Sequence, residues 1–383
     1  MRQPSYWEVG NLPPAMPAEP LPERVDVLIV GAGFMGRWLA YFLGKLQPQL
    51  RVLVLERDQF SYGASSRNAG FLTCGQVSEM LADAAEHGLP RVLEVFEQRR
   101  RGIAIARAEF PLLEVDPCGS VDHDELTDAG RALMQALNAH AGEALYVERE
   151  VNLGGRRRAA SFNRADAGVH PVKLLRMLQQ ASRADFRFGV QVESVSGGEC
   201  RTRDSRGEHV VRYGRAFVCV NAFAAKLAEC DVVPGRGQVI VTSPVNTATD
   251  RTLGYLNAGY DYFRFVDGRL LLGGGRNLFR TQEQTDEIAT TQNVLAHLKS
   301  LAAAILGHDQ FTVDYHWAGI MGFRGGSHLG GSPRQSIDTS TELAAGFGGM
   351  GVALAPVYAK QIAETIQGAP AAPAAGKTVS PAR

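Results

Sequence analysis

Apolar runs and an amphipathic stretch follow one another near the start of the chain in the order of a β-α-β unit. Residues 25–30 form a short apolar run without polar alternation, which is typical of a parallel strand buried on both faces. Residues 34–46 place Met35 and Leu39 on one face and predict a helix. Residues 51–55 then predict a second buried strand. The pattern therefore predicts strand, helix and strand in close succession.

The middle of the chain mixes helical and extended patterns. Apolar residues at helical spacing predict helices, and β-branched runs between turn residues predict strands. Asp267 and Gly268 have the composition of a two-residue hairpin turn. The predicted helices cover 77–108, 126–140, 172–181 and 284–306, and the predicted strands cover 186–195, 209–220, 237–242, 260–266 and 269–273.

The C-terminal region repeats the order of strand, glycine turn and helix. An aromatic-rich run at 311–317 predicts a strand, and a second extended run covers 343–347. The glycine-rich segment 348–351 follows directly, and residues 352–366 predict a final helix. This order is the same as that of the N-terminal unit.

The N-terminal glycine turn matches the pattern G-x-G-x-x-G. Gly31 makes the tight turn, Gly33 lets the backbone approach a pyrophosphate, and Gly36 permits close packing of the helix. The N-terminus of that helix supplies N–H groups and the positive end of its dipole. Glu56 closes the next strand, where a carboxylate accepts hydrogen bonds from a ribose. In this context the pattern predicts a dinucleotide site rather than a merely tight turn.

The residues around the second strand help to choose among dinucleotides. Arg57 is basic and would suit the 2′-phosphate of NADP, but the neighbouring Glu56 would repel it. Residues 63–70 put small hydroxyl residues and an arginine between two glycines, where the long FAD molecule passes its pyrophosphate and ribityl chain. An NAD dehydrogenase needs no such loop. We therefore favour FAD, with NAD as the alternative.

Composition excludes several other classes of protein. The 383 residues allow two lobes, and 40 basic residues balance 40 acidic ones, so we expect neither nucleic acid nor an anionic membrane as a partner. The five scattered cysteines and the spacing of the nine histidines predict neither a disulfide framework nor a metal site. No secretory signal and no membrane span is predicted, and we expect a cytoplasmic protein. A homo-oligomer is left open.

Together the motifs resemble those of the D-amino-acid-oxidase-like family of FAD-dependent oxidoreductases, which includes glycine oxidase and sarcosine oxidase. The resemblance covers nearly the whole chain. The segments 5–7 and 64–68 look most like the γ-glutamylputrescine oxidase branch. The resemblance is carried by 26–36, Glu56, 63–71, 218–222, 237–239, 267–269, Gly273-Gly274 and 346–351.

The resemblance implies an α/β fold, mixed α+β, with a Rossmann-type FAD-binding domain and an inserted β-sheet substrate domain. The FAD-binding domain, built on a parallel sheet, is expected to be discontinuous. The expected division is a proline-rich lead at 1–24, an FAD-binding domain at 25–90, 150–230 and 311–367, a substrate or cap domain at 91–149 and 231–310, and a disordered tail at 368–383.

The resemblance also implies which residues contact FAD. The loop after the second strand would line the flavin and pyrophosphate, and Val192 would present backbone to adenine. Asn221 and Ala222 would close over the adenosine, with an ordinary strand-end cap as the competing interpretation of Asn221. The expected set is Gly31, Gly33, Phe34, Met35, Gly36, Glu56, Arg57, Ser65, Ser66, Arg67, Asn68, Ala69, Gly70, Phe71, Val192, Asn221, Ala222, Gly319, Gly348, Gly349, Met350, Gly351 and Val352.

The C-terminal glycine turn bears on the state of the cofactor. A helix that begins there would point its dipole at flavin N1 and the C2 carbonyl, which carry negative charge in reduced flavin. Packing alone is the competing reason for these glycines. The neighbours of Ile320 offer no thiol, so noncovalent binding is expected, with Cys74 as a less favoured attachment point.

The activity that the resemblance implies is oxidation of the C–N bond of an amine or amino acid to an imine, by hydride transfer from the uncharged amine. Dioxygen, or another acceptor, would reoxidise the flavin. Tyr260, Tyr262 and Arg264 alternate along one predicted strand and share a face. If that face looks at the flavin, the tyrosines orient an amine and Arg264 a carboxylate; core aromatics and a surface arginine are the competing interpretation.

This sequence departs from the family at one position that matters for the substrate. Family members that bind an α-carboxylate often have an arginine where Met321 stands here. A free α-amino acid is therefore less favoured, unless Arg264 or Arg324 substitutes. The expected catalytic residues are Tyr260, Tyr262, Arg264, Arg324 and Met350. The alternatives are a noncatalytic flavoprotein of the same fold, one acting on an unusual substrate, and an NAD-dependent dehydrogenase.

Overall fold

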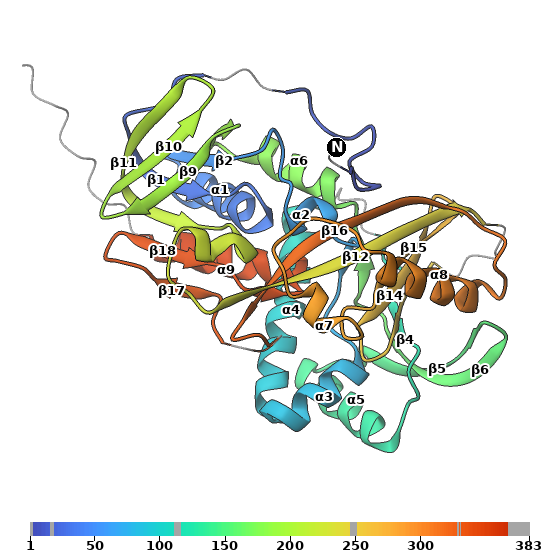
Figure 1. The fold of residues 1–383 in the computed structure, drawn as a ribbon. Helices are drawn as coiled ribbons and strands as arrows, with labels where there is room; N and C mark the ends of the chain where they lie inside the picture. Colours follow the sequence, from blue (N-terminus) through green and yellow to red (C-terminus); the bar gives the residue numbers. More distant parts are fainter. Residues whose placement is uncertain are drawn as a thin grey trace, which may run out of the picture.

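Two large sheets and a group of helices make up the structure (Figure 1). The computed structural model describes residues 3–15, 19–110, 116–245, 251–327, 329 and 331–366. The expected tail at 368–383 lies outside the described residues. None of the helices in these ranges is long and apolar enough to cross a membrane.

The first sheet has the predicted parallel core. Its central strand β1 pairs in parallel with β2 on one side and with β11 on the other. The predicted β-α-β unit is confirmed, because α1 (Phe34–Leu46) joins β1 to β2. The strand order is β17 (Arg334–Ser336), β18 (Thr341–Ala344), β11 (Gly207–Val218), β1 (Arg24–Val30), β2 (Val52–Glu56) and β8 (Asp185–Phe188), with β17 antiparallel to β18.

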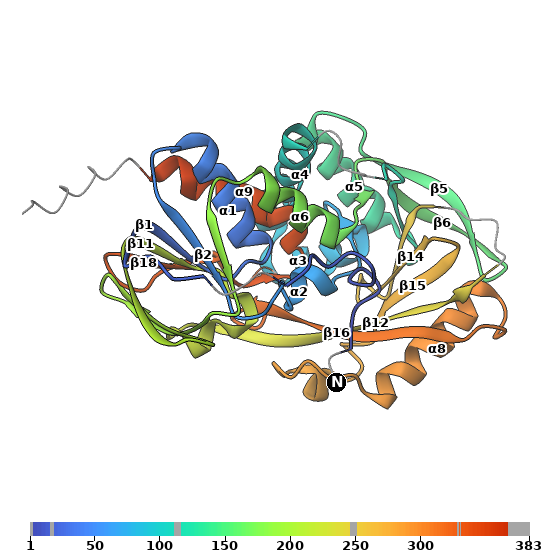
Figure 2. The same ribbon diagram turned by 90° about the horizontal axis from the view of Figure 1, so that it is seen from above.

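Both faces of β1 are covered, which explains its uninterrupted apolar run. Val27 and Ile29 belong to the apolar cluster that contains the buried residues of α1, α6 (Pro171–Ala181) and α9 (Gly351–Thr365). Leu28 belongs to the cluster on the other face, together with apolar residues of β9 (Gln191–Ser196) and β10 (Glu199–Asp204). Figure 2 shows α1, α6 and α9 side by side over the sheet.

The second sheet is mainly antiparallel and is built around the long strands β12 and β16, which pair from Val232 to Thr242. The helix α8 (Gln292–Leu306) packs Val294 and Leu298 on one face of this sheet. The strand order is β19 (Phe347–Gly348), β16 (Val313–Arg324), β12 (Val232–Pro244), β15 (Arg269–Gly274), β14 (Asp261–Val266), β13 (Leu253–Leu256), β4 (Ser120–Asp122), β6 (Arg156–Asn163) and β5 (Tyr146–Leu153).

The second sheet takes strands from parts of the chain that were expected in the FAD-binding domain. β6 lies within 150–230 and β16 within 311–367, and both pair in the second sheet. Because β16 begins in the second sheet and α9 packs on the first, the C-terminal region crosses from one to the other.

Some predicted elements differ from the observed ones. The helix predicted at 77–108 is two helices, α3 (Val77–His87) and α4 (Leu89–Glu109), because Gly88 between them has φ +82°. The helix predicted from 284 begins only at Gln292, after the short α7 (Arg280–Glu283). The hairpin turn is confirmed, since Asp267 and Gly268 both have positive φ. The remaining elements are α2 (Ala64–Arg67), β3 (Phe71–Leu72), α5 (Asp128–Ala141), β7 (Ala167–Gly168) and the 3₁₀ helix Asn221–Lys226.

Candidate active site

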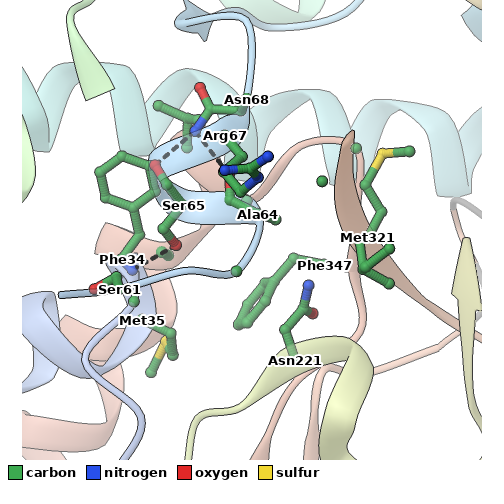
Figure 3. A pocket seen from close by; sticks show the side chains of 18 of the residues that line it. Phe34, Met35, Ser61, Ala64, Ser65, Arg67, Asn68, Asn221, Met321 and Phe347 are labelled. Carbon is green, nitrogen blue, oxygen red and sulfur yellow. Dashed lines mark hydrogen bonds between the residues drawn. The ribbon is translucent and has the colours of Figure 1, made fainter. Parts of the chain in front are cut away.

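A cavity of about 500 Å³ lies where the two sheets meet. Val30 and Leu55, at the carboxyl ends of β1 and β2, line it from the first sheet. Val239 and Met321, on β12 and β16, line it from the second. In Figure 3 the loop with Ser65 and Asn68, the side chain of Phe347 and that of Met321 surround this space. Ligands of open parallel sheets bind at this edge.

The first glycine turn is shaped as the motif predicts. Gly31 has φ +100°, and a Cβ there would lie 2.7 Å from the Cys219 carbonyl oxygen. A Cβ at Gly33 would lie 2.9 Å from Ser65 Oγ, and one at Gly36 only 2.0 Å from the Gly31 oxygen. The N-cap residue of α1 is Gly33, which has no side chain to cap the helix, and the first turn has no acidic residue. This N-terminus is therefore suited to a pyrophosphate.

Glu56 stands at the end of β2 as predicted. Its Oε2 accepts a hydrogen bond from the Ala32 N–H at 3.0 Å, and its Oε1 accepts one from the Asp58 N–H at 3.2 Å. Burial raises the pKa of this carboxyl, and the two N–H groups oppose that rise. Arg57 Nε lies 3.3 Å from Asp58 Oδ2, and its guanidinium lies over the Phe223 ring at 4.6 Å. Arg57 is thus engaged by the protein itself at the edge of the cavity.

The loop after β2 is tied to the glycine turn. Ser65 Oγ accepts a hydrogen bond from the Phe34 N–H at 2.9 Å (Figure 3). Asn68 Nδ2 donates to the Ser65 carbonyl oxygen at 2.8 Å, and its Oδ1 accepts from the Gly70 N–H at 2.8 Å. Since Ser65 and Asn68 both line the cavity, the loop presents polar groups where a pyrophosphate and ribityl chain would pass.

The residues before β1 hold this loop from behind. Trp7 Nε1 donates to the Asn68 carbonyl oxygen at 2.7 Å, and Ser5 Oγ donates to that of Ser66 at 2.9 Å. Arg67 Nη1 lies 3.2 Å from Glu8 Oε2, and both side chains are buried. The N-terminal lead therefore forms part of the structure around the cavity.

A second helix N-terminus borders the cavity at α9. Residues 348–352 all line the cavity. Met350 is the N-cap of α9, and the helix has neither a side-chain cap nor an acidic residue in its first turn. A Cβ at Gly349 would lie 3.8 Å from Met321 Sδ. The first N–H groups of α9 are thus available to a ligand with partial negative charge.

Most of the predicted site residues come together around the cavity. Ser66, Gly70 and Ala222 instead pack behind its wall, so we correct the expectation that they line it. Ser66 Oγ, for example, donates to the Ser61 carbonyl oxygen at 2.6 Å. Gly36 also lies behind the wall, where it allows the close packing of the helix that the motif predicts. The predicted residues that line the cavity are Gly31, Gly33, Phe34, Met35, Glu56, Arg57, Ser65, Arg67, Asn68, Ala69, Phe71, Val192, Asn221, Tyr260, Tyr262, Gly319, Gly348, Gly349, Met350, Gly351 and Val352.

The two arginines expected at the substrate lie away from the cavity. Arg264 Nη1 donates to the Gly70 and Val169 carbonyl oxygens at 3.0 and 3.2 Å. Arg324 Nη1 lies 2.6 Å from Asp231 Oδ1, and its Nε donates to the Ser332 carbonyl oxygen. Both guanidiniums bind protein groups outside the set that lines the cavity, so their placement does not support the predicted roles.

A third arginine, which the sequence analysis passed over, does line the cavity. Arg276 lies over the ring of Tyr260 at 5.5 Å and over that of Phe323 at 4.4 Å. Burial lowers its pKa. The signal in the sequence was its place directly after the glycines 273–275, at the end of a strand. Gln76, Glu79 and Tyr255 also line this part of the cavity and were missed.

The tyrosines form the aromatic wall near Arg276. Tyr262 packs edge-on against Phe71 at 5.7 Å, and Phe71 packs in the same way against Tyr255 at 5.2 Å. Burial raises the pKa of Tyr262 to about 12, so its phenol stays protonated at neutral pH. Within the described ranges, no group of three or more His, Cys, Asp or Glu side chains is arranged to hold a metal ion.

A glycine turn at a helix N-terminus, a carboxylate at the next strand end and a cavity between two sheets define a dinucleotide-binding protein. The family model described as FAD dependent oxidoreductase, DAO, matches residues 26–365, and the chain belongs to this family. FAD is therefore its cofactor. Gly33 leaves room beside Ser65, and the N-termini of α1 and α9 have no acidic residue in their first turns; both features fit that molecule.

Solved structures share the fold over most of its length. Glycine oxidase from Geobacillus kaustophilus superposes with a TM-score of 0.70 at 18% identity, covering 90% of this chain and 94% of that one. L-proline dehydrogenase from P. horikoshii gives 0.69 at 17% identity with the same coverage. L-amino acid deaminase from Proteus myxofaciens, in complex with anthranilate, gives 0.69 at 15%, covering 91% of each chain. No curated protein sequence matches the chain.

Proposed function

We propose that this enzyme oxidises the C–N bond of an amine or amino acid to an imine, with noncovalently bound FAD as oxidant and dioxygen as the final electron acceptor. The observation that carries the proposal is that one cavity joins the dinucleotide turn to a chamber with tyrosines and Arg276. The amino acid enzymes among the structural neighbours support it. Bound FAD supplies the acceptor for the hydride that leaves the carbon next to the amine nitrogen.

The tyrosines orient the amine in this proposal. The Tyr262 phenol, whose pKa burial raises to about 12, donates a hydrogen bond and accepts one through its oxygen. The Tyr260 ring shields the chamber beside Arg276. The protein's contribution is thus to hold an uncharged amine in the chamber. The α9 N-terminus would stabilise negative charge on the flavin bound beside it.

Arg276 is the proposed binding group for a substrate carboxylate. Its burial disfavours the charged guanidinium, and a carboxylate would compensate for that cost. It takes over the role that was expected of Arg264 or Arg324. Met321 stands where related enzymes often have a carboxylate-binding arginine, and Arg276 supplies a guanidinium to the same chamber. This replacement favours an enzyme over a noncatalytic flavoprotein. The bound anthranilate of the deaminase, an amine with a carboxylate, agrees with this substrate class.

Atoms and electrons balance over the whole reaction. The amine loses a hydride and a proton to become an imine, and water hydrolyses the imine to a carbonyl compound and ammonia or a smaller amine. Dioxygen takes up the two electrons and two protons and becomes hydrogen peroxide.

In this proposal Cys74 plays no part in holding the flavin. It lies behind the cavity wall, where its N–H donates to Asp166 Oδ1 at 2.7 Å.

A peroxide assay tests the proposal. The purified holoenzyme is supplied with air and with polyamines, N-methyl amino acids and D- and L-amino acids, and hydrogen peroxide and ammonia are measured together. Peroxide release with one class of amine supports the proposal and identifies the class. Oxidation of an amine with a dye but not with dioxygen would correct only the acceptor. If no amine is oxidised with either acceptor, the proposal is wrong.

A further inference from the structure

A buried arginine lies directly behind the glycine turn of the FAD site. Arg37 follows the last glycine of the motif near the start of α1, and its side chain is fully buried. Its Nε donates to the Ala32 carbonyl oxygen at 2.6 Å, and its Nη1 donates to that of Leu175 at 3.1 Å. Arg37 lies outside the set of residues that line the cavity, and the proposed function gives it no role.

The surroundings of the Arg37 guanidinium are neutral. Its hydrogen-bond acceptors are the carbonyl oxygens of Ala32 and Leu175, the Gln179 amide oxygen and Ser61 Oγ. Three aromatic rings lie 4.9 to 5.9 Å from the guanidinium carbon, those of Phe60, Phe186 and Phe188. Burial lowers the pKa of Arg37 to about 9, and the more distant Glu56 offsets only part of this effect. The protein therefore keeps a positive charge here at a cost.

The groups that accept hydrogen bonds from Arg37 do not depend on it. Leu175 lies inside α6, where the helix itself uses the backbone carbonyl groups. The Ala32 carbonyl oxygen also accepts a hydrogen bond from Ser61 Oγ. Gln179 is partly exposed and can bind water. Since a buried charge without a counter-charge is unfavourable, a negative group that binds nearby explains this arginine better than the packing of the protein alone does.

The contact with Ala32 fixes the peptide group that leads into Gly33. Glu56 Oε2 accepts a hydrogen bond from the Ala32 N–H at 3.0 Å, and the Ala32 carbonyl oxygen accepts from Arg37 and Ser61. Because this peptide is planar and trans, the Gly33 N–H points away from Arg37. Gly33 lines the cavity, and its N–H has no acceptor among the residues that the structure describes. Arg37 thus holds the peptide in an orientation that leaves the Gly33 N–H for a ligand.

We propose that Arg37 is a positioning residue for the pyrophosphate of FAD. It orients the Gly33 N–H towards a phosphate oxygen, and its buried positive charge adds to that of the α1 N-terminus in attracting the two phosphates. The pyrophosphate in turn supplies the counter-charge that the surrounding side chains lack. Arg37 acts from behind the cavity wall, so the inference goes beyond the proposed function and does not depend on which amine is oxidised.

Ligand binding to the full-chain protein freed of flavin tests this inference without any turnover. Calorimetric titration compares ADP, which has the pyrophosphate, with adenosine, which keeps only the ribose that Glu56 would bind, and flavin fluorescence gives the affinity for FAD. We expect Arg37→Met to bind ADP and FAD at least about 10-fold more weakly and adenosine within about 2-fold of the wild type. Arg37→Lys keeps the charge and is expected to recover most of the loss. Arg51→Met, which removes a 60% exposed guanidinium beside β2, is the matched control and should change none of the three affinities.

The stability of the flavin-free protein separates this role from a purely structural one. An apolar side chain of similar volume removes the cost of the buried charge, so the urea midpoint of Arg37→Met is expected to equal or exceed that of the wild type. If Arg37→Met does not fold, the neutral and polar Arg37→Gln gives the same comparison of ligands. An unchanged affinity for ADP would overturn the inference. Equal losses of affinity for ADP and adenosine would also overturn it, because they would show that Arg37 only supports the fold.

Discussion

Glu8 Oε2 lies 3.2 Å from Arg67 Nη1, in an ion pair whose side chains are 3% and 1% exposed. The pair joins the lead before the first strand to the loop that lines the FAD cavity. Arg67 also donates from Nε to the Ala318 carbonyl oxygen on β16, so one guanidinium connects the lead, the loop and the second sheet. The lead is thus a structural part of the cofactor site.

Loss of the Glu8 carboxylate is therefore expected to destabilise the holoenzyme and to weaken FAD binding. Glu8→Ala removes the buried carboxylate beside the Arg67 guanidinium, which costs about 3 kcal/mol or more. Urea unfolding and flavin fluorescence titration measure the two effects. Glu23→Ala, an exposed acidic residue of the same lead, is the matched control and should change neither. An unfolding midpoint of Glu8→Ala equal to that of the control would refute the role of the pair.

A side chain at Gly33 is expected to abolish FAD binding while leaving the fold intact. An added Cβ would already lie 2.9 Å from Ser65 Oγ, and the larger Gly33→Val side chain fills the approach to the pyrophosphate. The purified variant should be colourless and retain the circular dichroism of the wild type. A yellow variant with an unchanged flavin content would show that the pyrophosphate binds elsewhere.

Arg276→Gln is expected to act on the affinity for carboxylates. It should raise KM for amino acids about 100-fold, the loss of one charge-assisted bidentate pair, and leave KM for amines without a carboxylate nearly unchanged. Steady-state kinetics on an amino acid and the amine that lacks its carboxylate measure the difference. Arg264→Gln is the comparison, because that side chain binds backbone oxygens behind the cavity and should reduce stability instead. If Arg264→Gln instead raised KM for amino acids and Arg276→Gln did not, Arg264 would be the residue that binds the substrate carboxylate.

The stability of the protein should depend on pH through Asp166. Burial raises the pKa of this carboxyl to about 7, well above its unfolded value, so the folded state holds the proton more firmly. The resulting stabilisation is complete below about pH 4 and is lost as the pH rises towards 7. Asp166→Asn cannot titrate. The stability of the wild type relative to this variant, from urea unfolding between pH 4 and 8, should fall up to about pH 7 and then level off; a rise would contradict the assignment.

The cofactor half of the site was predictable because its chemistry is local in the sequence. The turn at Gly31, the helix behind it and Glu56 lie within one β-α-β unit, and each has a fixed role there. Hydrogen bonds such as that from the Phe34 N–H to Ser65 Oγ then bring the next loop against it. The strand and helix bounds of this unit agree with the prediction to within a residue.

The substrate half depends on contacts between distant segments, which the pattern of one chain does not reveal. Tyr262 and Arg264 share a strand, yet Tyr262 faces the cavity and Arg264 reaches the carbonyl oxygens of Gly70 and Val169. Tyr260 precedes that strand, in a turn where Asn257 and Ala258 have positive φ. This packing determines which arginine reaches the cavity, and that arginine is Arg276.

The most direct test of the account is anaerobic stopped-flow absorbance of the purified yellow holoenzyme mixed with amines and amino acids. The account predicts that the flavin band bleaches with a rate that saturates in one class of amine, and that denaturation releases FAD into solution. A protein that stays yellow with every amine but bleaches with dithionite would contradict the proposed activity.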